Sequence, residues 1–154
     1  MKLFLDTANL KDIEEALKAG FIRGITTNPS LLAKEPKTEY LAHMKKIVEL
    51  LKHDGNDYPL SVEVFTDNQN LMIAQAEEFS EALHYENIAI KIHISRGSQN
   101  NLFVVRELSK RRIKVNCTAC MTPLQAMMAA ASGAKYVSIF YNRVRDGKED
   151  QKFI

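Results

Sequence analysis

The chain alternates between strand-like and helix-like patterns, and this alternation constrains its fold more than any other feature. Short apolar runs between turn residues are typical of strands, and apolar residues spaced three and four apart are typical of helices. Six such pairs fill the 154 residues without a linker. Unbroken alternation predicts one α/β domain, residues 1–154, with helices outside a parallel sheet. Strands are expected at 2–6, 22–26, 59–64, 87–94, 113–117 and 136–140, and helices at 9–19, 29–34, 38–52, 68–83, 99–111 and 122–132.

The strand at 87–94 carries a lysine where an apolar strand is normally buried. Its four isoleucines share one face, and Lys91 and His93 share the other. Strands of a parallel sheet are covered on both faces, so Lys91 would be paired or neutral. A neutral buried amine can form a Schiff base with a carbonyl substrate. The alternative is an edge strand with Lys91 in solvent, and His93 is expected to be a packed core residue without a role.

One face of all six strands carries polar residues, whereas the other face is mostly apolar. A doubly wound sheet is apolar on both faces, but a barrel has apolar residues under its helices and polar groups inside at the strand ends. No glycine-rich phosphate loop follows a strand, which argues against a nucleotide-binding fold. The sequence therefore predicts a (β/α)8 TIM barrel of which six β/α units are present. Its interior would collect Asp6, Thr26, Asn28, Glu63, Lys91, Asn116, Thr118, Ser138 and Phe140.

Composition excludes several classes of protein. The net charge of +2 offers no basic surface for nucleic acid or membrane. No apolar run approaches the ~18 residues of a transmembrane helix, and an acid at residue 6 argues against a signal peptide. Cys117 and Cys120 have no second ligand pair, so they are expected to be reduced structural thiols rather than metal ligands. These observations predict a cytoplasmic protein without a metal.

The expected interior matches what Schiff-base chemistry requires. A lysine amine attacks a ketone, a carboxylate with a positioned water moves protons during dehydration, and a second acid or base drives carbon–carbon cleavage. Arg143, just past the sixth strand, could bind a phosphate at the rim. Structural alternatives stay open: Asp6 could cap a helix, Glu63 could only neutralise Lys91, and Arg143 could be a solvated surface charge.

Several motifs resemble a known family. The segments M-K-L-F-L-D-T-A-N at 1–9 and G-I-T-T-N-P-S-L-L at 24–32 resemble the opening of the transaldolase family, in the small branch that includes fructose-6-phosphate aldolase. Further matches are E-V at 63–64, I-K-I around Lys91, N-C-T at 116–118 and S-x-F-x-x-R at 138–143. The chain departs from the family after Lys91, where I-P-x-T is usual and His93 takes the place of the proline.

The resemblance implies a transferase of the pentose phosphate pathway that needs no cofactor. It would move a dihydroxyacetone unit between fructose 6-phosphate, erythrose 4-phosphate, sedoheptulose 7-phosphate and glyceraldehyde 3-phosphate, and it would be a homo-oligomer. Lys91 matches the Schiff-base lysine and Asp6 the acid/base of cleavage, while Glu63 and Thr118 match the pair that holds the catalytic water. The substrate-binding side chains would be Thr26, Asn28, Asn116, Ser138, Phe140 and Arg143, the last on the phosphate.

Two rival functions remain open at the level of the sequence. Fructose-6-phosphate aldolase is a lyase, and its pattern has Gln and Tyr where this chain has Glu63 and Phe140. Those two residues favour the transferase. The other rival is a catalytically inactive, truncated module that binds a partner, because a TIM barrel typically has ~200 residues or more. Six strands would leave two open edges.

Overall fold

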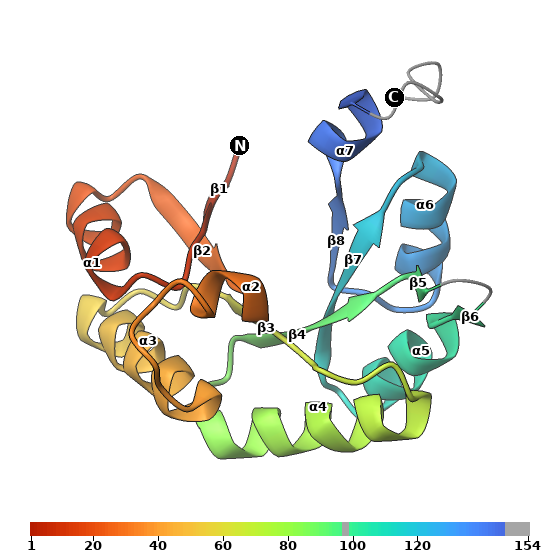
Figure 1. Cartoon of the computed structure of the whole chain (residues 1–154), viewed down its shortest axis with the longest axis horizontal. Coiled ribbons are helices and arrows are strands. Elements are labelled where there is room, and N and C mark those ends of the chain that lie inside the picture. Colours follow the sequence, from red (N-terminus) through yellow and green to blue (C-terminus); the bar gives the residue numbers. More distant parts are fainter. Residues whose placement is uncertain (97–98, 147–154) are drawn as a thin grey trace.

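Six parallel strands form one curled sheet, in which their spatial order follows the chain (Figure 1). The computed structural model describes residues 1–96 and 99–146. The sheet closes part of a circle, so the predicted TIM-barrel-like fold with six β/α units is confirmed. The strands are β1 (Leu3–Asp6), β2 (Ile22–Thr26), β3 (Leu60–Glu63), β4 (Ile88–His93), β7 (Lys114–Cys120) and β8 (Tyr136–Ile139).

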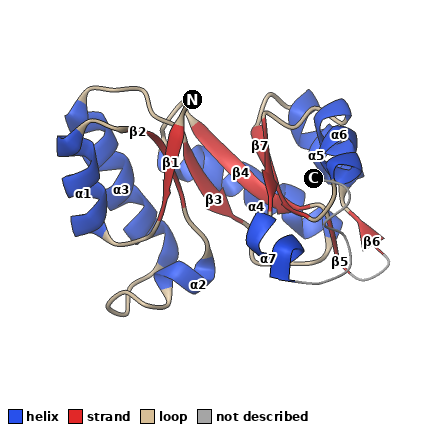
Figure 2. Ribbon diagram, turned by 90° about the horizontal axis from the view of Figure 1, so that it is seen from above, coloured by secondary structure: helices blue, strands red, loops and turns tan. Residues whose placement is uncertain are grey.

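The long helices cover the outer side of this sheet, as Figure 2 shows from above. Along the chain each long helix lies between two consecutive strands of this sheet and returns the backbone to the start of the next parallel strand. The two short helices follow β2 and β8. The helices are α1 (Leu10–Ala19), α2 (Pro29–Leu32), α3 (Tyr40–Asp54), α4 (Gln69–Leu83), α5 (Leu102–Lys110), α6 (Pro123–Ala131) and α7 (Tyr141–Asp146). None of the helices within the described residues is long and apolar enough to span a membrane.

Local sequence signals explain where the helices begin and end. The side chain of Asn9 accepts a hydrogen bond from the backbone of α1, and Gly20 ends that helix with φ of 70°. Thr122 and Gln125 form a reciprocal capping box at the start of α6. These caps satisfy backbone groups that a helix leaves unpaired at its ends.

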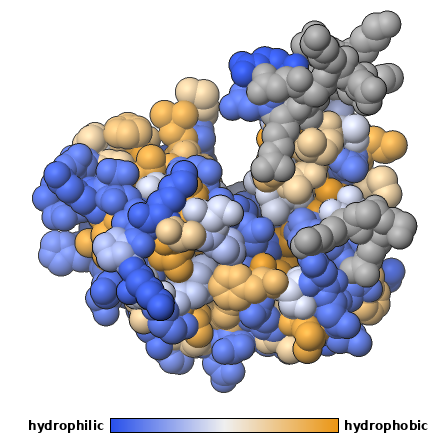
Figure 3. All heavy atoms as spheres, in the orientation of Figure 1, coloured by the Kyte–Doolittle hydropathy of each residue, from blue (hydrophilic) through white to orange (hydrophobic). Residues whose placement is uncertain are grey.

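The core lies between the outer face of the sheet and the helices. Leu60, Ile90 and Val115 point outward from three neighbouring strands and are fully buried. Cys117 and Cys120 join this core as free, buried thiols. Figure 3 shows the opposite, inner side as a hollow at the top of the view, between the N-terminal strands and α7.

The structure corrects the sequence prediction in three places. Residues 99–101 do not start a helix: β5 (Ser95–Arg96) and β6 (Gln99–Asn100) pair as an antiparallel hairpin, and α5 begins at Leu102. The fifth predicted strand runs on to Cys120 instead of ending at Cys117, through an irregular register. Helix α7 was not predicted at all.

The two outermost strands of the sheet each have a single neighbour among the described strands. β1 pairs with β2, and β8 pairs with β7. Leu3 on β1 and Ile139 on β8 are 45% and 42% exposed. The rings of Phe4 and Tyr136 meet edge to face across the interior, with centroids 6.0 Å apart. Both edges of the sheet are therefore open to further pairing.

Candidate active site

Lys91 lies in the middle of the sheet and inside the molecule. Strand β4 is flanked by β3 and β7, and Lys91 is 6% exposed, so the edge-strand alternative is wrong. Its Nζ donates a hydrogen bond to the backbone oxygen of Thr27 at 3.0 Å. The same Nζ lies 3.3 Å from Oε2 of Glu63, its register partner on β3. The amine is thus buried, paired and held in one position.

Asn116 is held beside Lys91 by two serines. It is the register partner of Lys91 on β7 and is almost fully buried. Its Nδ2 donates to Oγ of Ser61 at 3.1 Å, and its Oδ1 accepts from Oγ of Ser138 at 2.8 Å. The small Ala89 of β4 lies in register with Ser61, which leaves room for Asn116 to reach across β4. This network fixes the amide against the lysine.

Asp6 and Thr26 form a separate pair at the ends of β1 and β2. They are register partners, and Oγ1 of Thr26 donates to Oδ1 of Asp6 at 2.6 Å. The helix after β1 is capped by Asn9, so the helix-capping alternative for Asp6 is wrong. Asp6 itself is exposed. An exposed carboxylate with a fixed orientation at the end of a barrel strand can exchange protons with a bound molecule.

The remaining predicted residues lie at the same end of the sheet. Asn28 is half-buried, and its Oδ1 accepts a hydrogen bond from the backbone N–H of Leu31 at 2.9 Å, which caps α2. Phe140 is half-buried and its N–H donates to the backbone of Cys120 at 3.0 Å. Arg143 falls in α7, but its side chain lies outside the described residues.

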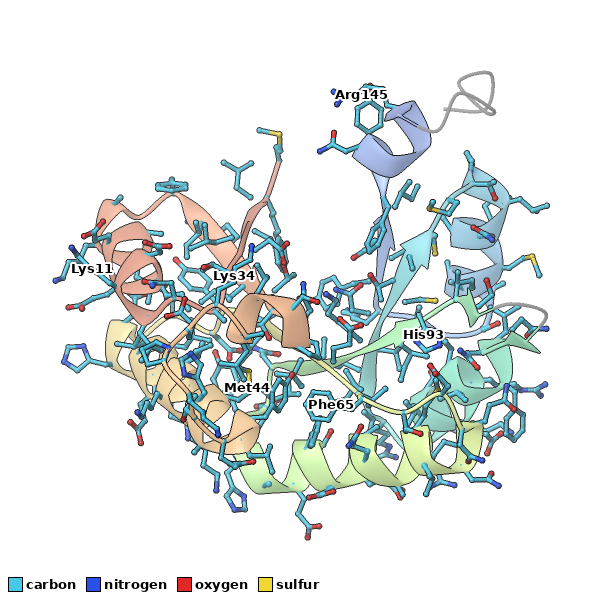
Figure 4. The ribbon with its side chains drawn as sticks, in the orientation of Figure 1. Lys11, Lys34, Met44, Phe65, His93 and Arg145 are labelled. Carbon is cyan, nitrogen blue, oxygen red and sulfur yellow. The ribbon has the colours of Figure 1, made fainter. Side chains whose placement is uncertain are left out.

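Thr118 is buried and its hydroxyl has no partner. The residue is 2% exposed, and its Oγ1 makes no hydrogen bond within the described part of the chain. Its register partner on β4 is His93, which Figure 4 labels at the end of that strand. Thr118 is a residue of strand β7, and it points to the same interior as Lys91 and Asn116.

Two residues that support this site were missed by sequence reasoning. Thr27 supplies the backbone oxygen that accepts a hydrogen bond from Lys91. Its place in the T-T-N-P motif, between the predicted site residues Thr26 and Asn28, could have marked it. The hydroxyl of Tyr40 accepts a hydrogen bond from the backbone N–H of Glu63 at 3.0 Å. Burial raises the pKa of Tyr40 to about 12, so the hydroxyl stays protonated. Tyr40 gave no signal, because its role depends on how α3 packs against β3.

Within the described residues, no cluster of three or more His, Cys, Asp and Glu side chains could hold a metal ion. The fold and this interior together define a TIM-barrel-like α/β protein with a lysine–carboxylate pair at the centre of its sheet.

The family model described as Transaldolase/Fructose-6-phosphate aldolase matches residues 3–152. The chain belongs to this family, and the resemblance of its motifs is confirmed. Curated relatives agree: a "Probable transaldolase" from Thermoanaerobacter sp. (strain X514) is 42% identical over 150 residues, and one from Thermoplasma volcanium is 38% identical over 152 residues. Each match covers 97% of this chain and 64% of the relative. The chain therefore spans less than two thirds of the length of these relatives.

Solved structures with little sequence similarity share the fold. A putative phosphonomutase from Burkholderia cenocepacia J2315 matches with a TM-score of 0.65 at 15% identity, over 96% of this chain and 68% of that one. A thiamine phosphate pyrophosphorylase from Pyrococcus furiosus matches with a TM-score of 0.55 at 16% identity, over 89% of this chain and 59% of that one. At such identities the likeness concerns the fold alone.

Proposed function

We propose that this chain acts as a transaldolase of the pentose phosphate pathway, with Lys91 as the covalent carrier of a dihydroxyacetone unit. The observation that carries the proposal is the buried amine of Lys91, 3.3 Å from the Glu63 carboxylate and in register with Asn116. Membership of the family and the names of the relatives support an aldolase-type reaction. The substrates are sugar phosphates.

The site residues fit successive steps of this reaction. Glu63 takes the proton of the ammonium group, and the neutral amine attacks the ketone carbon. Asp6, oriented by Thr26, takes the hydroxyl proton whose removal breaks the carbon–carbon bond. The amide of Asn116 and the hydroxyl of Ser138 bind hydroxyl groups of the dihydroxyacetone unit, with Thr26, Asn28 and Phe140 around it. Arg143 binds the phosphate.

The covalent intermediate provides the test. The full chain is incubated with fructose 6-phosphate, reduced with borohydride and weighed intact by mass spectrometry. We expect one increment of the size of reduced dihydroxyacetone, located on Lys91 by peptide mapping and absent from Lys91→Met. Lys114→Met, which removes another lysine, is the matched control and should keep the increment. If the folded chain without substitutions gains no mass, the proposed Schiff-base activity is wrong.

A lyase is the second candidate, because the matched family includes fructose-6-phosphate aldolase. Glu63 and Phe140 favour the transferase, as the aldolase pattern has Gln and Tyr in their places. Release of glyceraldehyde 3-phosphate without an acceptor would indicate the lyase, and release that requires erythrose 4-phosphate would indicate the transferase. The inactive interaction module stays as the third candidate, supported by the exposed apolar residues on β1 and β8. A homo-oligomer would cover such surfaces.

A further inference from the structure

Two buried polar atoms face the same interior without a hydrogen-bond partner in the described residues. They are Oγ1 of Thr118 and Nε2 of His93. Buried polar atoms are normally paired, and an unpaired one costs free energy. His93 and Thr118 are register partners on strands about 4.8 Å apart. Two unpaired atoms on adjacent side chains mark a position where a small polar molecule would satisfy both.

The position between these two atoms lies next to Lys91, toward the carboxyl ends of β4 and β7. His93 follows Lys91 by two residues on the same strand, so both side chains project from the same face. Thr118 likewise follows Asn116 on β7. The unpaired atoms therefore belong to the next inward-facing residues after Lys91 and Asn116, nearer the carboxyl ends of β4 and β7. A water there would lie beside a carbonyl carbon bonded to Lys91.

Asp67 faces the imidazole of His93 from the segment between β3 and α4. Its Oδ1 lies 3.7 Å from Nε2, too far for a hydrogen bond but close enough to stabilise a positive imidazole. Among the side chains that the structure describes, Lys91 and Glu63 also lie on this side, and they form their own ion pair. Thr118 and Asn116, which face the imidazole from β7, do not titrate. Asp67 therefore places a carboxylate beside the imidazole of His93.

We infer that His93 is a catalytic acid and base of the Schiff-base steps, sharing with Thr118 the water that these steps release and consume. The inference rests on the proposed function and adds a residue to it. Histidine is the side chain suited to proton transfer near neutral pH. The family motif that this chain resembles usually has proline at this position, and proline has no group that transfers a proton.

The proton balance is complete without another reactant. During dehydration the carbon–oxygen bond of the carbinolamine breaks, and the lone pair of Nζ of Lys91 forms the carbon–nitrogen double bond. The leaving hydroxyl takes a proton from the imidazolium of His93 and departs as water, held by the hydroxyl of Thr118. During hydrolysis water attacks the same carbon, and the imidazole accepts the proton that the water loses.

The test isolates these steps from carbon–carbon cleavage. A ketone that forms a Schiff base exchanges its oxygen with water. Fructose 6-phosphate is therefore incubated with the full chain in heavy-oxygen water, and the increase in the mass of the sugar phosphate is followed by mass spectrometry. His93→Gln keeps a hydrogen-bonding side chain but cannot transfer a proton. We expect it to slow exchange by about 100-fold, to flatten the pH dependence of exchange between about pH 5 and 8, and to leave KM within about threefold.

Two further variants complete the experiment. His53→Gln changes an exposed histidine on α3 and should leave exchange unaltered. Asp67→Asn leaves the imidazole in place but removes the carboxylate 3.7 Å from it, so exchange at neutral pH should slow about tenfold. If His93→Gln does not fold, the exchange rate of Asp67→Asn tests whether His93 transfers protons in these steps.

Different failures are distinguishable. If folded His93→Gln exchanges oxygen at the same rate and with the same pH profile as the chain without substitutions, the role of His93 is wrong and the proposed function stays intact. An unmodified chain that neither exchanges oxygen nor forms the borohydride adduct would overturn both.

Discussion

Glu63 and Lys91 are register partners whose charged atoms lie 3.3 Å apart, yet solvent reaches them unequally. The side chain of Glu63 is 24% exposed and that of Lys91 is 7% exposed. The carboxylate can therefore be hydrated without its partner, whereas the ammonium group cannot. This asymmetry governs what each substitution does to the stability of the fold.

Removing Glu63 should destabilise the fold more than removing Lys91. Glu63→Ala leaves a buried positive charge, which we expect to cost about 3 kcal/mol. Lys91→Met replaces the charge with an apolar side chain of similar length, and we expect a change below about 1 kcal/mol, in either direction. Urea unfolding at pH 7 measures both. Glu14→Ala breaks the exposed pair with Lys18 and should have little effect. Equal losses for Glu63→Ala and Lys91→Met would contradict this asymmetry.

The interior of the sheet could be predicted because its strands are regular. Side chains alternate with period two, so one correct assignment of a strand fixes the face of every residue in it. Lys91, Glu63 and Asn116 were placed together in this way. Their register, which makes Lys91 the neighbour of both others, follows only from the paired strands.

The end of β7 could not be predicted, because its path departs from this alternation. Ala119 has φ of 58°, a left-handed conformation that alanine rarely adopts and that no local sequence signal marks. The register shifts between Cys117 and Cys120, and both thiols are buried. Contacts such as Tyr40 with Glu63, or Asp67 with His93, depend on the packing of distant segments and likewise left no pattern in the sequence.

Asn116 should be coupled energetically to Ser61. Asn116→Ala leaves the buried hydroxyl of Ser61 without the amide that donates to it, and we expect a loss of about 2 kcal/mol. Ser61→Ala should cost about 1 kcal/mol. The double variant should then be about 1 kcal/mol more stable than the sum of the two losses predicts, since both lose the same bond. A double-mutant cycle by urea unfolding tests this, and strict additivity would count against the network.

The stability of the fold should fall at high pH because of Tyr40. Burial raises the pKa of Tyr40 from 10.0 to about 12, so between these values the unfolded chain has lost a proton that the folded chain keeps. The contribution is complete below pH 10 and disappears as pH rises through about 12. We expect a slope of up to ~1.4 kcal/mol per pH unit in this window.

Tyr40→Phe separates this contribution from those of other groups. It removes the titrating hydroxyl, so the fall above pH 10 should become shallower, although the bond to Glu63 is also lost at every pH. Tyr85, whose pKa burial also raises to about 12, is less buried and should contribute a smaller part of the slope. Identical slopes for Tyr40→Phe and the unmodified chain, measured by urea unfolding from pH 9 to 12, would refute the assignment.

Gly24 and Gly133 should respond differently to the same substitution. A Cβ at Gly24 would lie within 2.8 Å of three atoms of the Phe4 ring, the free end of a side chain that is partly exposed. The ring can move away, so Gly24→Ala should cost about 1 kcal/mol. A Cβ at Gly133 would lie within 2.7 Å of both side-chain atoms of Ser109, and its φ of +102° disfavours any side chain. Gly133→Ala should therefore cost about 3 kcal/mol.

Second substitutions show whether steric crowding or backbone strain causes the loss of stability in each Gly→Ala variant. Phe4→Leu removes ring atoms that the new methyl group would meet, so it should recover most of the loss caused by Gly24→Ala. Ser109→Ala removes the hydroxyl, but Cβ of residue 109 and the unfavourable φ of residue 133 remain. It should recover less than half of the loss caused by Gly133→Ala. Full recovery in the second pair, measured by urea unfolding, would show that the backbone at Gly133 is not strained.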